Sequence, residues 1–227
     1  MKTGAVFLLL LFLPGLAVAA GPLTPDDGRP STLDFSLQLS NNKFPLEYAG
    51  RVQDGTSRWL GITLREKASD RVTLGMYGGN AWLSQTGNPL TEGLELDGFH
   101  AGLTLHAILL QSQRASLYGV LDYTYQKVDH KSDTQTIVID WAQSQMQLGV
   151  TLRLTPIWRL YGGGSYGKID GEERASGTVN HTLSFERGAR PGGFVGLDLS
   201  VEPDGYVGIE ARSGLVRSGE IYFKHRF

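Results

Sequence analysis

From residue 33 onward, apolar and polar residues alternate along most of the chain. The segment 33–39, Leu-Asp-Phe-Ser-Leu-Gln-Leu, is typical, and its period of two indicates a strand with two unlike faces. The same alternation recurs at 59–65, 72–76, 99–109, 117–125, 146–154, 158–166, 195–201, 207–211 and 220–227. No segment sustains a helical period. The pattern predicts about ten strands of roughly the 9–11 residues that a tilted transmembrane strand requires.

The segments between the predicted strands alternate between short and long. Short turns are expected at 66–70, 111–114, 155–156 and 202–205, and longer polar loops at 40–57, 79–97, 128–136, 169–192 and 213–218. We therefore predict an all-β fold, a closed antiparallel up-and-down transmembrane β-barrel of about ten strands, with eight or twelve as alternatives. An even number of strands places both termini of the chain at the end of the barrel where the short turns lie. Segment 177–187 also alternates, and we interpret it as a hairpin-like extension of the fourth long loop.

The first twenty residues have the pattern of a secretory signal peptide. Lys2 is followed by an apolar run at 5–13, and Ala17-Val18-Ala19 forms a small-x-small cleavage site. The run is shorter than the roughly 20 residues of a membrane-spanning helix, although a retained anchor is the alternative. We expect a signal peptide at 1–20, a periplasmic lead-in at 21–31 and the barrel at 32–227.

Composition excludes several kinds of chemistry. The chain has no cysteine, so disulfides, thiol catalysis and cysteine-based zinc sites are ruled out. The formal net charge of -2 gives no electrostatic case for a nucleic acid partner. The 30 glycines occur within the alternating segments as well as in turns, as the bends and close approaches of a barrel wall require.

The C-terminal segment 219–227 alternates and ends in an aromatic residue. Ile221, Phe223 and Phe227 share one face of the predicted last strand, and His225 departs from the apolar pattern. This segment resembles the terminal signal of bacterial outer-membrane β-barrels. The resemblance implies a protein of the cell outer membrane of Gram-negative bacteria, with periplasmic chaperones, the outer-membrane assembly machinery and outer-membrane lipids as partners.

If the apolar faces contact lipid, the polar faces line the lumen. In so narrow a barrel, side chains fill the interior and buried charges must be paired. Cations and carboxylates are nearly balanced, which favours a closed or narrow lumen over a selective pore. The predicted lumen charge network comprises Asp34, Arg65, Asp122, Arg153, Arg159, Asp198, Glu202, Glu210, Arg212, Glu220, Lys224 and Arg226.

No catalytic, cofactor-binding or metal-ligating set emerges from the sequence. Asp129-His130, with Asp133 nearby, is the only candidate for chemistry of the surface-protease type. His181 and Ser184 would point to opposite faces of a strand. His100 and His106 share a face but lie about 20 Å apart along a strand, too far to share a metal ion.

These observations favour a non-enzymatic barrel with a structural or surface-interaction role and an unknown surface partner for its loops. A narrow porin-like channel for small solutes is one alternative. A surface enzyme of the barrel protease or lipid-modifying type is another. A soluble periplasmic barrel, with its apolar faces turned inward, would show the same period of two.

Overall fold

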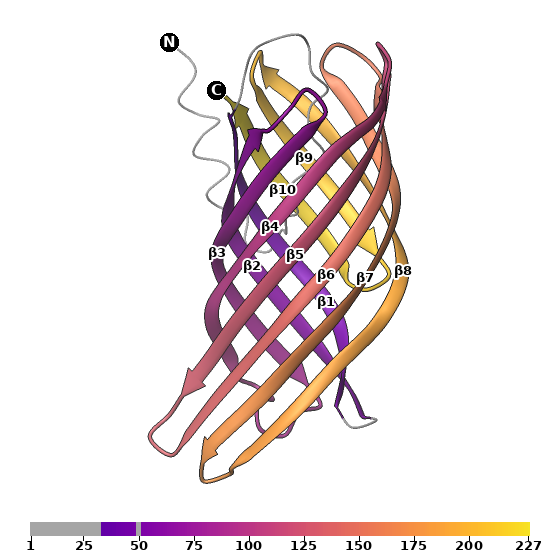
Figure 1. The fold of residues 1–227 in the computed structure, drawn as a ribbon. Helices are drawn as coiled ribbons and strands as arrows, with labels where there is room; N and C mark the ends of the chain where they lie inside the picture. The colour runs from indigo at the N-terminus through magenta and orange to yellow at the C-terminus, as the bar shows by residue number, and fades with distance from the viewer. Residues whose placement is uncertain (1–32, 49–50) are drawn as a thin grey trace, which may run out of the picture.

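The computed structural model describes residues 33–48 and 51–227, so the predicted signal peptide and lead-in lie outside the described residues. Every strand is antiparallel to its neighbours, and the sheet closes between the first strand and the last (Figure 1). The prediction of a ten-stranded up-and-down barrel is confirmed. The strands are β1 (Leu33–Tyr48), β2 (Arg51–Lys67), β3 (Val72–Thr86), β4 (Glu95–Gln111), β5 (Ala115–Lys131), β6 (Gln135–Arg153), β7 (Trp158–Gly177), β8 (His181–Glu202), β9 (Gly205–Ser213) and β10 (Arg217–Arg226).

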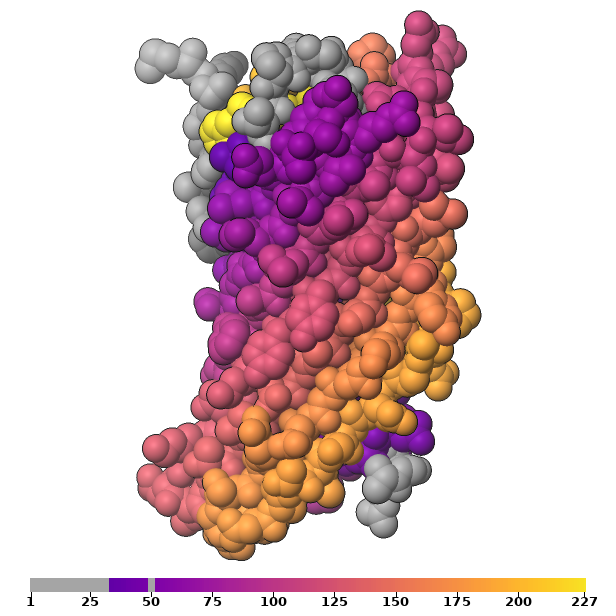
Figure 2. All heavy atoms as spheres, viewed as in Figure 1, coloured from indigo at the N-terminus to yellow at the C-terminus, as the bar shows by residue number. Residues whose placement is uncertain are grey.

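The two ends of the barrel differ. The start of β1, the end of β10 and the short turns share one end, the terminal end (top in Figure 1). At the opposite, distal end, the β5–β6 and β7–β8 hairpins project furthest (Figure 2). The short turns fall where they were predicted. Segment 177–187 belongs to the β7–β8 hairpin, as its interpretation as a hairpin-like extension requires.

The number of strands in the wall changes along the barrel. β9 and β10 have 9 and 10 residues, whereas the other strands have 15 to 22. β1 pairs with β10 from Asp34 to Lys43, but further out it pairs with β8 through Glu47 and Tyr48. The wall therefore has ten strands near the terminal end and eight at the distal end.

The prediction of long distal loops is wrong. Most of the residues assigned to loops continue the strands. The distal connections in the described part of the chain have three residues at 132–134, 178–180 and 214–216, and eight at 87–94. The reason is visible in β1, where alternate side chains face inward along its whole length. The inward residues are polar up to Asn42 and apolar from Phe44 to Tyr48. The two faces exchange polarity while the strand continues.

The exterior of the ten-stranded part carries an apolar belt. Large hydrophobic side chains there are half exposed, Leu103 to 62% and Met76 to 61% for example. The belt includes Leu37, Leu60, Ile62, Leu64, Leu74, Leu121, Met146, Leu148, Val150, Val195 and Ile209. An apolar surface of this extent marks contact with a protein or a membrane.

The described residues contain no helix that is long and apolar enough to cross a membrane.

Inside the belt, four tyrosines each lie across a glycine on a neighbouring strand. The glycine is in every case the direct register partner: Tyr77 with Gly102, Tyr118 with Gly149, Tyr161 with Gly196 and Tyr222 with Gly208. A methyl group at any of these glycines would overlap the tyrosine ring. The missing side chain thus lets each ring lie against the wall and cover the backbone.

Candidate functional site

The interior near the terminal end is a layer of paired charges. Asp34 Oδ1 lies 3.4 Å from Arg226 Nε across the β1–β10 closure. Asp198 Oδ2 lies 4.0 Å from Lys224 Nζ, and the same carboxylate accepts a hydrogen bond from the Tyr222 hydroxyl. These side chains are buried, so the pairing meets the requirement that charges removed from water have partners.

Arg212 is the centre of a second group of charges in this layer. Its Nε contacts Glu210 and lies 3.9 Å from Glu220 Oε2, and its Nη1 reaches Gln145 at 3.4 Å. One guanidinium therefore lies between two buried carboxylates. Arg159 is placed differently, 4.6 Å from the centre of the Tyr206 ring and 3.1 Å from its hydroxyl. Aromatic rings thus help to hold the cations.

The structure brings most of the predicted lumen residues together. The inward-facing members are Asp34, Arg65, Asp122, Arg153, Arg159, Asp198, Glu210, Arg212, Glu220, Lys224 and Arg226. Glu202 is the exception and corrects the prediction. The pairing of β8 and β9 shifts between Ser200 and Glu202, which breaks the alternation. The Glu202 carboxylate is 52% exposed and lies 3.6 Å from His225 Nε2.

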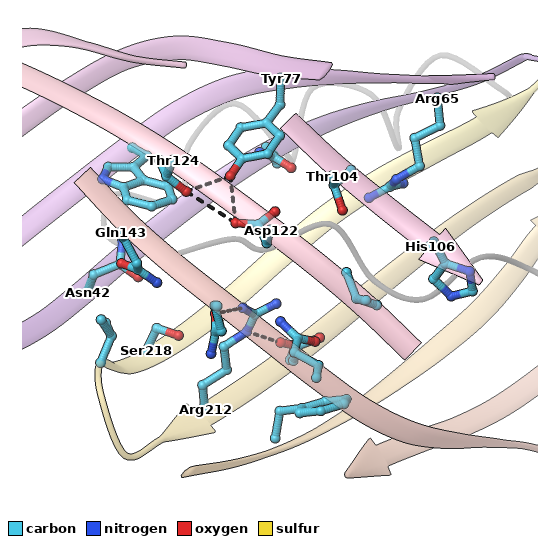
Figure 3. Close-up of a pocket in the computed structure, with 18 of the residues that line it drawn as sticks. Asn42, Arg65, Tyr77, Thr104, His106, Asp122, Thr124, Gln143, Arg212 and Ser218 are labelled. Atoms are coloured by element: carbon cyan, nitrogen blue, oxygen red, sulfur yellow. Dashed lines mark hydrogen bonds and ion pairs between the residues drawn. The ribbon is translucent and has the colours of Figure 1, made fainter. Parts of the chain in front are cut away.

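A polar cavity of about 90 Å³ lies in the middle of the lumen (Figure 3). The Tyr77 hydroxyl donates to Asp122 at 2.8 Å and lies 2.5 Å from Thr124 Oγ1. His106 and Arg65 point into the same space. A polar space of this size holds a few water molecules.

His100 and His106 are both buried on the lumen side of β4. His106 stacks on Tyr118 with the ring centres 5.0 Å apart, and His100 stacks on Trp59 at 4.8 Å. The Trp59 indole in turn donates to Gln126 at 2.9 Å. These rings fill the lumen at two levels.

Beyond the cavity, the distal interior is an apolar core. The Phe44 and Trp141 rings lie 5.8 Å apart across it, and both are buried. The other buried members are Leu46, Tyr48, Ala81, Leu83, Leu96, Val128, Ile137, Ile139, Ile169, Phe185 and Leu215. An eight-stranded ring is just wide enough for side chains to fill. Because the wall narrows to eight strands where its inward side chains become apolar, those side chains can fill the distal interior.

The β3–β4 connection 87–94 folds over the mouth of this core. Asn88 is buried there and donates from Nδ2 to Glu173 Oε2 at 2.9 Å. Glu173 is itself 1% exposed, and His181 Nε2 lies 3.2 Å from its other oxygen. Burial raises the pKa of the nearby Tyr48, and the charge of Glu173 raises it further. We name Asn88, Glu173 and His181 the rim cluster.

Sequence reasoning missed the rim cluster because it tested His181 only against Ser184. The signal available was a glutamate in an inward register position of a strand whose inward neighbours, Ile169 and Ala175, are apolar. The candidate pair Asp129-His130 is divided between the two faces of β5. Asp129 is exposed on the outer face, and His130, the next residue of β5, lies on the inner face.

The residues of the C-terminal pattern lie on the outer face of β10. Ile221 and Phe223 are half-buried there, and Phe227 is 69% exposed. The His225 ring lies among them, 4.7 Å from that of Phe227 and 6.5 Å from that of Phe223. The histidine that departs from the sequence pattern is thus part of an aromatic row.

No family model and no curated protein matches this chain in sequence. Its fold is similar to that of the outer membrane protease OmpT from Escherichia coli, with a TM-score of 0.51, 12% identity and coverage of 92% of this chain and 99% of that one. An outer membrane channel from Pseudomonas putida F1 is similar with a TM-score of 0.51 and 12% identity, over 92% of this chain and 100% of that one. The beta domain of the Bordetella autotransporter BrkA is similar with a TM-score of 0.50 and 14% identity, over 87% of this chain and 100% of that one. Their functions differ, so the likeness concerns the fold alone. The chain has the fold of bacterial outer-membrane β-barrel proteins, a general class rather than one family.

Proposed function

We propose that this protein is an integral outer-membrane β-barrel that forms no channel and presents its distal end as an interaction surface. The observation that carries the proposal is that two different closures follow each other along the lumen. A layer of paired charges and tyrosines fills the terminal part, and an apolar core fills the distal part.

The apolar belt supports the membrane location. It surrounds the ten-stranded part, where the interior is polar, and it ends where the polarity of the two faces exchanges. A soluble barrel would have the opposite arrangement in this part. With the terminal end in the periplasm, the eight-stranded part stands outside the membrane, with its apolar residues inside and polar residues in water.

The two closures support a barrel without a continuous water path. An ion crossing the charged layer would have to separate pairs such as Asp198 and Lys224, which are buried together. An ion crossing the distal core would meet buried Phe44 and Trp141. Such an apolar constriction excludes water by dewetting. The cavity of about 90 Å³ is lined by side chains of the charged layer, among them Arg65, Asp122 and Arg212, and it ends before the distal core.

The same core supports a surface-interaction role. Because side chains fill the distal interior, the projecting hairpins rise from a packed base rather than from an open rim. The β5–β6 turn presents exposed Asp133 and Thr134, and the β7–β8 turn presents Val179, which is 40% exposed. Turns on a rigid scaffold are where binding residues are commonly found.

Cell fractionation and heat-dependent gel mobility test the membrane location. We expect the protein in the outer-membrane fraction and a shift in mobility on boiling. A periplasmic protein without a shift would overturn the proposal.

Planar bilayer recording tests the closure. We expect no steady conductance at a protein load where a porin conducts. Steady single-channel openings that change with substitutions at Asp122 or Arg212 would establish the narrow-channel alternative instead.

A further inference from the structure

Among residues 33–48 and 51–227, three exposed basic side chains without acidic partners gather at the junction where the wall changes from ten to eight strands. Lys43 on β1 and Arg217 on β10 are direct register partners, and both are exposed on the outer face. Like charges directly opposite each other on a sheet destabilise it. Arg190 on β8 is exposed close to Arg187, at the shift in register between Gly167 and Ile169, where the alternation of β8 is broken.

Arg187 fixes the backbone around this group. Its guanidinium donates from Nη1 to Pro45 O and from Nη2 to Gly214 O, both at 3.1 Å. One side chain thus joins β8, β1 and the β9–β10 turn, where β8 has lost its β9 neighbour beyond Gly193. Burial lowers the pKa of Arg187, and the positive charges of Arg190 and Arg217 lower it further. The basic side chains therefore repel each other in the protein alone.

Several other exposed basic side chains on the barrel have acidic partners. Arg58 pairs with Glu95, Lys168 with Asp170, and Arg174 with Asp140 and Glu172. Within 33–48 and 51–227, by contrast, Lys43, Arg190 and Arg217 form no ion pair with a carboxylate. The carboxylates on the adjoining part of the wall, Glu47 and Glu186, face each other two strand steps further out.

The height of the group relative to the apolar belt indicates what it meets. On β1 the outward residues are apolar through Leu39, and Lys43 follows two strand steps later. On β10 the last apolar outward residue is Ile221, and Arg217 lies two steps beyond it. Four residues span about 13 Å at roughly 3.3 Å per residue, less along the membrane normal for a tilted strand. Lipid headgroups occupy this zone on the outer side of the hydrocarbon region.

From these observations we propose that Lys43, Arg190 and Arg217 bind the phosphate groups of a lipid headgroup in the outer leaflet. Guanidinium groups bind phosphate through paired hydrogen bonds, and a lysine adds a point charge. Arg187 acts as a positioning residue that holds the three strands around the site. The proposal rests on the membrane location proposed above.

The test measures the affinity of the purified barrel, in non-ionic detergent, for fluorescently labelled lipopolysaccharide with intact phosphates. The variant is K43Q/R190Q/R217Q. The control, K127Q/K131Q/R174Q, removes the same charge from the outer face of the distal β5–β7 region, away from this group. We expect binding at least about tenfold weaker for the first variant and nearly unchanged binding for the control. Heat-dependent gel mobility shows that each variant is folded.

Two further arms identify the source of the phosphate. Dephosphorylated lipopolysaccharide should bind to the wild type as weakly as the intact lipid binds to the variant. Inorganic phosphate at millimolar concentration should not displace the lipid. Equal affinity of wild type and K43Q/R190Q/R217Q, or of the two lipids, overturns the site, and displacement by inorganic phosphate overturns the assignment to a lipid. Fractionation reports separately on the membrane location, so its failure is distinguishable from failure of this site.

Discussion

Tyr222 on β10 lies across Gly208, its register partner on β9, and its hydroxyl reaches Asp198 on β8 and lies 3.0 Å from the Tyr161 hydroxyl. The glycine gives the ring room to lie flat, and the flat ring brings its hydroxyl to the charged layer. The fit of one ring over one glycine thus connects the wall of the barrel to its interior charges.

Replacing Gly208 with alanine should destabilise the barrel, because the new methyl group would overlap the Tyr222 ring. We expect a loss of about 1–3 kcal/mol in the free energy of unfolding, the usual cost of overpacking. Urea unfolding in lipid vesicles, followed by tryptophan fluorescence, measures it. Gly219 on the same hairpin is the control, since a methyl group there would meet nothing within 4 Å. Equal effects at the two glycines would contradict this account.

Removing the Asp198 carboxylate should lower the free energy of unfolding by more than Gly208→Ala does. Asp198→Ala takes away the carboxylate that lies 4.0 Å from Lys224 and the acceptor of the Tyr222 hydroxyl. Loss of one member of a buried pair costs about 3–5 kcal/mol, because the remaining charge stays buried. The double variant D198A/K224M should recover part of that loss in the same unfolding measurement. A double variant less stable than D198A would show that the pair is not the source of the effect.

Truncating the distal core should weaken the protein without opening it. Trp141→Ala removes a side chain that is 1% exposed, which costs about 3–5 kcal/mol. The charged layer remains, so bilayer recordings should stay silent. Val138→Ala, on the outer face of the same strand, is the control for stability. Steady conductance in W141A would mean that the charged layer does not close the lumen.

Disrupting the rim cluster should release the segment that covers the distal mouth. Glu173→Ala removes the acceptor for Asn88 and the partner of His181, both at the base of residues 87–94. We expect faster cleavage within 87–94 by a non-specific protease added to intact vesicles. Glu173→Gln keeps an acceptor oxygen and should be cleaved at a rate closer to wild type. Unchanged cleavage in E173A would show that other contacts hold the segment.

The sequence allows the fold to be predicted further than the site. Alternation shows where strands lie, and the short turns mark one end, so the ten-stranded ring could be predicted. The distal halves of strands could not, because the prediction assumed that apolar residues always face outward. In β6, Ile137, Ile139 and Trp141 face inward, and Met146 and Leu148 on the same strand face outward. A change of surroundings along one strand reverses the assignment.

The charged residues that face the lumen could be predicted, but which of them pair with one another could not. Inward positions follow from alternation, and Glu202 escapes only because the β8–β9 register shifts beside it. The rim cluster and the basic group depend on contacts between strands far apart in the sequence. Lys43 and Arg217 are 174 positions apart in the chain yet face each other in the β1–β10 pairing. Register across the closure of a barrel cannot be read from a single strand.

The double pairing of β1, with β10 near the terminal end and with β8 at the distal end, has a consequence for assembly. β1 and β8 can join before the last hairpin is in place, which reduces the final step to inserting β9 and β10 into a ring that is already held at one end. The absence of natural cysteines makes the order measurable. A disulfide between E47C and E186C should form earlier during refolding than one between S40C and E220C, which face each other in the β1–β10 pairing. The β9–β10 hairpin would then be the last element to enter the barrel, and ring closure would not depend on it.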